Sequence, residues 1–185
     1  DAVKIILQLH SLILSFGGIP LLYYGDELGT LNDNSFLEDE SKASDNRWIH
    51  RPKIDWEKAQ LRHQHGTIEQ RIFDGLKKLI AVRKNIQAFA DFNNRELIEV
   101  ENEHLFAFIR TNPAHHNEAV LVVVNFDGHP QHLNLSNLGK RGYFDFALLK
   151  DLASGESPAI FKDELVIPPY RFYWLASARS VGGFE

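Results

Sequence analysis

The chain has 185 residues, which is enough for one ordinary domain or for one small domain plus part of another. Its hydrophobic fraction of 44% and charged fraction of 24% are typical of a soluble globular protein. A formal net charge of −5 provides no basic surface for nucleic acid and no polybasic face for a membrane, so both kinds of partner are disfavoured. The absence of cysteine excludes disulfides and thiolate chemistry, and it fits a reducing compartment.

The first 25 residues predict a helix, a tight turn and a buried strand. Apolar residues at positions 1–16 spread almost all round a helix, which indicates packing on more than one side. Interspersed polar side chains argue against a signal peptide or a membrane span. Gly17, Gly18 and Pro20 end this helix. "IPLLYYG", residues 19–25, is a continuous apolar run that predicts a strand covered on both faces, as in an α/β barrel or a doubly wound sheet.

Residues 25–66 show no sustained period and contain many Asp, Asn, Ser and Gly residues. A loop of this length is usually functional or disordered, and its tryptophans and arginines argue against disorder. It follows the carboxyl end of the predicted strand, where barrels and open sheets place their active sites. The sequence therefore predicts an active-site loop at 25–66.

A helix follows, with Thr67 and Gln70 forming a capping box, and it ends near Asn85. Beyond it the apolar period becomes two, and turn residues separate about eight short strands. This pattern predicts an antiparallel β-sandwich. The predicted strands are "RELIEVENE", "HLFAFIRT", "EAVLVVVNF", "PQHLNL", "YFDFALL", "PAIF", "DELVIP" and "YRFYWLA".

The chain contains no recognisable cofactor or metal motif. His63 and His65 lie two apart, which is not a closed zinc spacing, and there is no P-loop, no GxGxxG and no GxSxG serine. We therefore expect neither a cofactor nor a metal.

Two acidic clusters could supply the paired carboxylates of glycosidic chemistry. Asp26 and Glu27 follow the predicted strand directly, but adjacent residues at a strand end point apart, so either of them could instead support the loop by accepting hydrogen bonds. The cluster at 38–40 is expected to be a solvated face.

The segment "SDNRWIHRPKIDW", residues 44–56, concentrates two arginines and two tryptophans in the loop. The Arg47 guanidinium suits a carboxylate or a row of hydroxyls, and Trp48 and Trp56 offer flat faces of the kind that stack on sugar rings. Trp48, His50 and Arg51 are also candidates for support of the loop. The alternative is a loop pinned by Arg–Asp pairs, with its tryptophans packed at the rim of a barrel.

These residues carry a resemblance to a known family. "GGIPLLYYGDELG" resembles the eighth barrel strand of the α-amylase superfamily, glycoside hydrolase family 13, and "GDELGTLNDNSFLEDESKASDNRWIHRP" resembles amylosucrases and sucrose hydrolases. The resemblance implies an α+β chain. Residues 1–90 would form the last helix–strand–helix part of a (β/α)8 TIM barrel, residues 91–179 an antiparallel β-sandwich, and residues 180–185 a tail.

The function implied by this resemblance is transfer of glucose from sucrose to an α-1,4-glucan with release of fructose and retention of configuration. Arg47 matches the family's arginine at the floor of the glucosyl pocket, which makes it the expected substrate-binding residue. The family's catalytic carboxylates, and the aspartate that pairs with this arginine, lie on earlier barrel strands that this chain lacks. We therefore expect a C-terminal portion that is inactive alone and needs the remainder of the barrel to act on sucrose and α-glucan, in the cytoplasm of a bacterium or, less favoured, after secretion.

Three alternatives stay open. The parent enzyme could be a sucrose hydrolase or a more general α-glucosidase or α-amylase. The sandwich could also be a non-catalytic carbohydrate-binding module. Such modules usually expose a platform of aromatics, whereas most aromatics of this region sit at alternating positions that indicate core: Phe106, Phe108, Phe126, Phe144, Phe146, Phe172 and Trp174.

Overall fold

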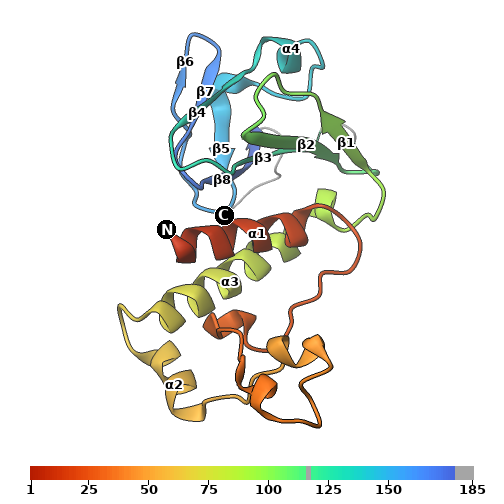
Figure 1. Cartoon of the computed structure of the whole chain (residues 1–185). Helices are drawn as coiled ribbons and strands as arrows, with labels where there is room; N and C mark the ends of the chain where they lie inside the picture. Colours follow the sequence, from red (N-terminus) through yellow and green to blue (C-terminus); the bar gives the residue numbers. More distant parts are fainter. Residues whose placement is uncertain (116–117, 178–185) are drawn as a thin grey trace. The chain divides into compact units, whose positions relative to one another are not determined.

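The computed structural model describes residues 1–115 and 118–177, so the predicted tail at 180–185 lies outside the described residues. The chain divides into two compact units, one made of residues 1–20 together with the chain from residue 77 onward and the other of residues 21–76 (Figure 1). Within the described ranges, no helix has the length and hydrophobicity that crossing a membrane requires. The helices are α1 (Ala2–Ser15), α2 (Trp56–Gln60), α3 (Ile68–Lys84) and α4 (Ser136–Gly139), with short 3-10 helices η1 (Asp26–Leu28), η2 (Ser35–Glu38), η3 (Asn46–His50), η4 (Leu61–His63), η5 (Gln87–Phe89) and η6 (Phe146–Leu148).

The first helix is confirmed, but the strand predicted after it is wrong. Helix α1 ends at Ser15, and Gly17 and Gly18 then take positive φ angles of 128° and 75°. Residues 19–24 form no strand, and Ile19 and Leu21 are 84% and 78% exposed. A strand needs a neighbour for its backbone hydrogen bonds, and no strand in the described part of the chain pairs with this segment. Its apolar composition alone does not create a strand.

The long segment predicted as a loop is built from short helical turns. These turns bury Leu28, Phe36 and Ala59, so the segment has small apolar anchors of its own. The helix after it is confirmed as α3, and its N-terminus is capped as expected, because Gln70 N donates to Thr67 Oγ1 at 3.2 Å. The Gln70 side chain accepts from Gly66 N at 3.3 Å, one residue earlier than a capping box requires.

The C-terminal region is an antiparallel β-sheet domain, as predicted. A five-stranded sheet has the order β1-β2-β3-β8-β5, and a three-stranded sheet has the order β4-β7-β6. The strand predicted at 143–149 is only partly correct, because Asp145 accepts from Ala147 N at 3.2 Å and starts η6 instead. The strands are β1 (Arg95–Ile98), β2 (Leu105–Thr111), β3 (Ala119–Asn125), β4 (Gln131–Asn134), β5 (Leu149–Asp151), β6 (Ile160–Phe161), β7 (Glu164–Ile167) and β8 (Phe172–Ser177).

The five-stranded sheet is buried on both faces. One face packs against the smaller sheet, around residues such as Leu121, Leu165 and Leu175. The other face packs Phe108 and Trp174 against α1 and the C-terminal end of α3, below the sheet in Figure 1. All seven residues of β3 are therefore buried, which explains its unbroken apolar run. The predicted aromatic core is largely confirmed: Phe108, Phe144 and Trp174 are buried and most others are partly buried, but Phe126 is 44% exposed.

Three arginines donate hydrogen bonds to backbone carbonyls at the C-terminal end of α1. The last carbonyls of a helix have no partner within the helix and carry the negative end of its dipole, so guanidinium groups suit them. Each arginine comes from a different element, namely α3, β1 or β2. The contacts run from Arg83 Nε to Leu14 O (2.7 Å), from Arg95 Nη1 to Phe16 O (2.7 Å) and from Arg110 Nη1 to Ser15 O.

Candidate functional site

The candidate site is the segment from residue 25 to residue 56, which lies within one compact unit. Gly25 begins it with a φ of 92°, and Thr30 N folds back to donate to Gly25 O at 2.9 Å. Asp26 Oδ2 accepts from Tyr23 N at 3.2 Å, and Glu27 Oε2 accepts from Gly25 N at 2.9 Å. Both carboxylates thus accept hydrogen bonds from backbone amides of the same turn, and their role in supporting the loop stays a prediction.

Arg47 stands on η3 with its side chain 71% exposed. Asp45 is the N-cap of η3 and accepts from Arg47 N at 3.0 Å, as well as from Nε and Nη2, both at 2.8 Å. The side-chain hydrogen bond from Arg47 lowers the pKa of Asp45 to about 2, and the same bond raises the pKa of Arg47. Within residues 1–115 and 118–177, Nη1 donates no hydrogen bond, so part of the guanidinium stays available to a ligand.

Trp48 is half-buried and surrounded by cations. Lys42 Nζ lies 5.3 Å from its ring centroid and Arg51 Cζ 5.6 Å, which are distances of cation–π contacts. Asp39 holds Lys42 through an ion pair of 2.6 Å. Trp48 and Arg51 therefore pack against each other within the loop. Trp56, in contrast, is 69% exposed.

Hydrogen bonds tie η3 to the segment that precedes it. His50 Nδ1 lies 3.1 Å from Asn32 Oδ1, and Asp33 N donates to Ile49 O at 3.0 Å. Tyr24 Oη donates to Pro52 O at 3.4 Å. The exposed guanidinium of Arg47 thus lies on a loop whose segments are joined to one another by hydrogen bonds.

The chemistry open to this arrangement is binding. An exposed guanidinium such as that of Arg47 can hold a carboxylate or sugar hydroxyls. Asp26 and Glu27 are engaged with backbone amides of their own turn, and no group of three or more His, Asp or Glu residues in the described ranges could hold a metal ion. The pairing of Asp45 with Arg47 is a contact of the kind that the alternative interpretation of this loop, pinned by Arg–Asp pairs, predicts, and Asp45 also serves as the N-cap of η3.

A family model and two curated relatives match parts of this chain. Residues 95–174 match the family model of the maltogenic amylase C-terminal domain. Glucosylglycerate phosphorylase of Escherichia coli (strain K12) is 27% identical over 167 residues, covering 90% of this chain and 27% of that protein. Trehalose synthase of Thermus thermophilus is 27% identical over 150 residues, covering 69% of this chain and 15% of that protein.

A solved structure shows the same fold. The structure of AmyP in complex with maltose superposes with a TM-score of 0.65 at 17% identity, covering 95% of this chain and 35% of that one. Residues 95–174 are thus similar to the C-terminal domain of maltogenic amylases, and the fold of the described chain is similar to that of AmyP. It spans less than a third of the length of either curated relative.

Proposed function

We propose that this chain is the C-terminal part of a sucrose-cleaving enzyme that transfers the glucosyl unit of sucrose to an α-1,4-glucan and releases fructose. The observation that carries the proposal is Arg47, exposed on η3 within "DNRWIHRP" and with Nη1 directed to no partner among the described residues. Similarity to α-amylase family enzymes supports the reaction class.

Arg47 would bind the glucosyl unit and take no part in bond breaking. In a retaining reaction, one carboxylate displaces fructose from the anomeric carbon and forms a glucosyl–enzyme ester, while a second carboxylate protonates the leaving oxygen. The second carboxylate then removes the proton from the glucan hydroxyl that attacks this ester. Both carboxylates belong to the part of the enzyme outside this chain, so the chain alone is expected to be inactive.

The test is an assay of the parent polypeptide that contains this region. With sucrose, we expect fructose release, and Arg47→Ala should lower kcat/KM about 10- to 100-fold, since hydrogen bonds from a charged donor are each worth about 1.5–3 kcal/mol. Arg71→Ala, which changes an exposed arginine on α3, is the matched control and should leave turnover unchanged. Cleavage of starch or maltose without turnover of sucrose would contradict the proposal.

A second candidate is phosphorolysis, in which phosphate instead of glucan accepts the glucosyl unit. It is favoured by the relative named glucosylglycerate phosphorylase, which aligns with 90% of this chain. Running the sucrose assay with and without inorganic phosphate separates the acceptors. A sugar phosphate indicates phosphorolysis, free glucose a sucrose hydrolase, and lengthened glucan the transferase proposed above.

A further inference from the structure

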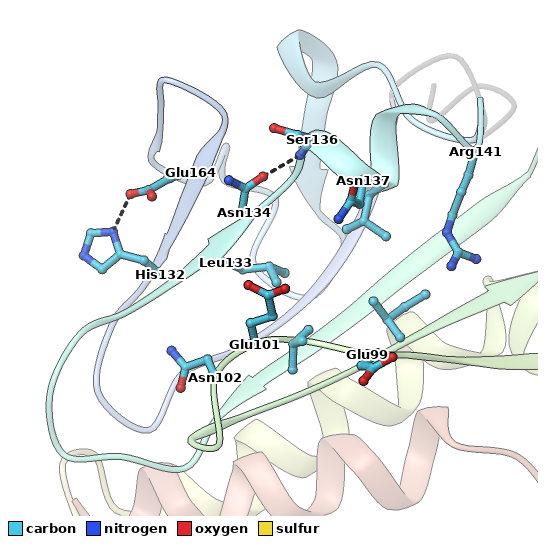
Figure 2. Close-up of a pocket in the computed structure, with 13 residues that line it drawn as sticks. Glu99, Glu101, Asn102, His132, Leu133, Asn134, Ser136, Asn137, Arg141 and Glu164 are labelled. Carbon is cyan, nitrogen blue, oxygen red and sulfur yellow. Dashed lines mark hydrogen bonds and ion pairs between the residues drawn. The ribbon is translucent and has the colours of Figure 1, made fainter.

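The β-sheet domain contains a hollow of about 830 Å³, remote in sequence from the Arg47 segment (Figure 2). This volume lies within the range of small-molecule sites, roughly 300–1,000 Å³. In Figure 2, Glu99, Glu101 and Asn102 line one side, and Asn134, Asn137 and Arg141 line the other. The two sides come from the connection between β1 and β2 and from the segment of β4 and α4.

The polar groups of the hollow include unused donors and acceptors. Glu99 and Glu101 make no hydrogen bond or ion pair within the described ranges, so both carboxylates can accept. Asn134 Oδ1 accepts from Ser136 N at 2.9 Å, which leaves its amide N–H groups to donate. Arg141 is paired with Glu96 through Nη1 and has further N–H groups.

The floor of the hollow is apolar. Leu133 and Leu138 are 6% and 3% exposed and belong to the core between the two sheets. Ile98 and Val100 pack partly buried against the same core. A ligand in the hollow would therefore meet hydrocarbon beneath it and hydrogen-bonding groups at its sides.

These features together select a class of ligand. The carboxylates disfavour anions, and no cluster suited to a metal ion exists in the described ranges. A pyranose ring has apolar C–H faces and a rim of hydroxyls that both donate and accept, which matches an apolar floor with mixed polar walls. We propose that the hollow is a binding site for a neutral carbohydrate chain. The choice of an α-glucan as that chain rests on the proposed function.

The experiment is a titration of the 185-residue chain with maltoheptaose, followed by two-dimensional NMR of amide groups. We expect shifts at backbone amides of residues 98–102 and 132–138 and at the side-chain amides of Asn134 and Asn137. Glu101→Ala should weaken binding about tenfold, as expected for loss of a hydrogen bond to a charged acceptor. Glu103→Ala is the matched control, because Glu103 is exposed near the hollow but does not line it, and it should bind like the unchanged chain.

Shifts confined to other residues, or equal affinity in the Glu101 and Glu103 variants, would overturn the proposal. A response to spermidine without one to maltoheptaose would do the same, since it would indicate recognition of ammonium groups. The outcome is independent of the assay on the parent polypeptide. Glucan binding without sucrose turnover would refute the proposed function and keep the site, whereas sucrose turnover without shifts at the hollow would refute the site alone.

Discussion

Replacement of Arg110 tests whether a single buried guanidinium holds α1 to the sheet domain. Arg110 has no exposed surface, and it donates to Ser15 O, to Asp91 O and to Asn94 Oδ1. Its guanidinium also lies 5.7 Å from the ring centroid of Phe89. No carboxylate accepts a hydrogen bond from it among the described residues, so its hydrogen bonds go to neutral acceptors, while the charge of Asp91 favours the guanidinium without such a bond.

The expected loss follows from two opposing terms. Three hydrogen bonds from a charged donor contribute about 1.5–3 kcal/mol each. Burial, and then repulsion by Arg95, lowers the pKa of Arg110 to about 10, which corresponds to roughly 3 kcal/mol against the charged form. The hydrogen-bond contribution that remains after this penalty is subtracted is lost in Arg110→Ala, and truncation also leaves a cavity. Together these two effects should lower the free energy of unfolding by about 3 kcal/mol.

Urea denaturation followed by tryptophan fluorescence measures this loss, with a thermal scan as a second readout. At roughly 2–4 °C per kcal/mol for a chain of this length, Tm should fall by about 6–12 °C. Arg110→Lys keeps the charge but cannot reach three acceptors, so an intermediate loss is expected. Arg71→Ala should change stability by less than about 0.5 kcal/mol. If Arg110→Ala unfolds within about 1 kcal/mol of the unchanged chain, the interpretation of these contacts as a stabilising clamp is wrong.

The remaining predictions concern the turn after α1 and the loop ion pair. At Gly17, with φ at 128°, an added Cβ would lie 2.7 Å from a backbone carbonyl oxygen, whereas at Gly18, with φ at 75°, it would meet nothing within 4 Å. Urea midpoints should therefore show about 1 kcal/mol of loss for Gly18→Ala and clearly more for Gly17→Ala, and equal losses would disprove the steric argument. By NMR, the Asp45 carboxyl should titrate near pH 2 and return towards about 3.9 in Arg47→Ala. Because the folded-state pKa of Asp45 is lowered, the stabilisation from the ion pair is present above the unfolded value near 4 and is lost as pH falls to about 2. If the titration midpoint of the Asp45 carboxyl is the same in Arg47→Ala, the pair is not formed in solution.

The local sequence pattern was sufficient to predict an element when that element forms its backbone hydrogen bonds within itself. Helices α1 and α3 form within their own hydrogen bonds, so the apolar stripe and the Thr67 cap predict them well. The antiparallel strands were also predictable, because period-two patterning and turn residues are local signals. The strand predicted at residues 19–25 was wrong for the opposite reason. A buried strand depends on partner strands, and the composition of one segment does not indicate whether those partners are present.

The candidate site was predictable in its residues but not in its contacts. Residue types marked Arg47 and Trp48 as chemistry-bearing, and the loop does expose the guanidinium of Arg47. That Lys42 and Arg51 would both lie near the Trp48 ring could not be read from spacing, since the loop brings positions six before and three after it together. The hollow at Glu101 was equally invisible, because its two sides are about thirty residues apart in the sequence.

The three arginine contacts also show that the β-sheet domain is larger than the segment matched by its family model. That segment covers residues 95–174, yet one face of its main sheet is covered by Leu14 of α1 and by Leu79 of α3. Arg95 and Arg110 lie inside the segment and bind carbonyls of residues 15 and 16, about eighty to ninety-five residues earlier. Without α1, the apolar face around Trp174 would lose part of its cover, and Arg110 would keep its charge but lose one of its acceptors. The compact unit therefore comprises the sheet domain together with α1 and the part of α3 from residue 77 onward.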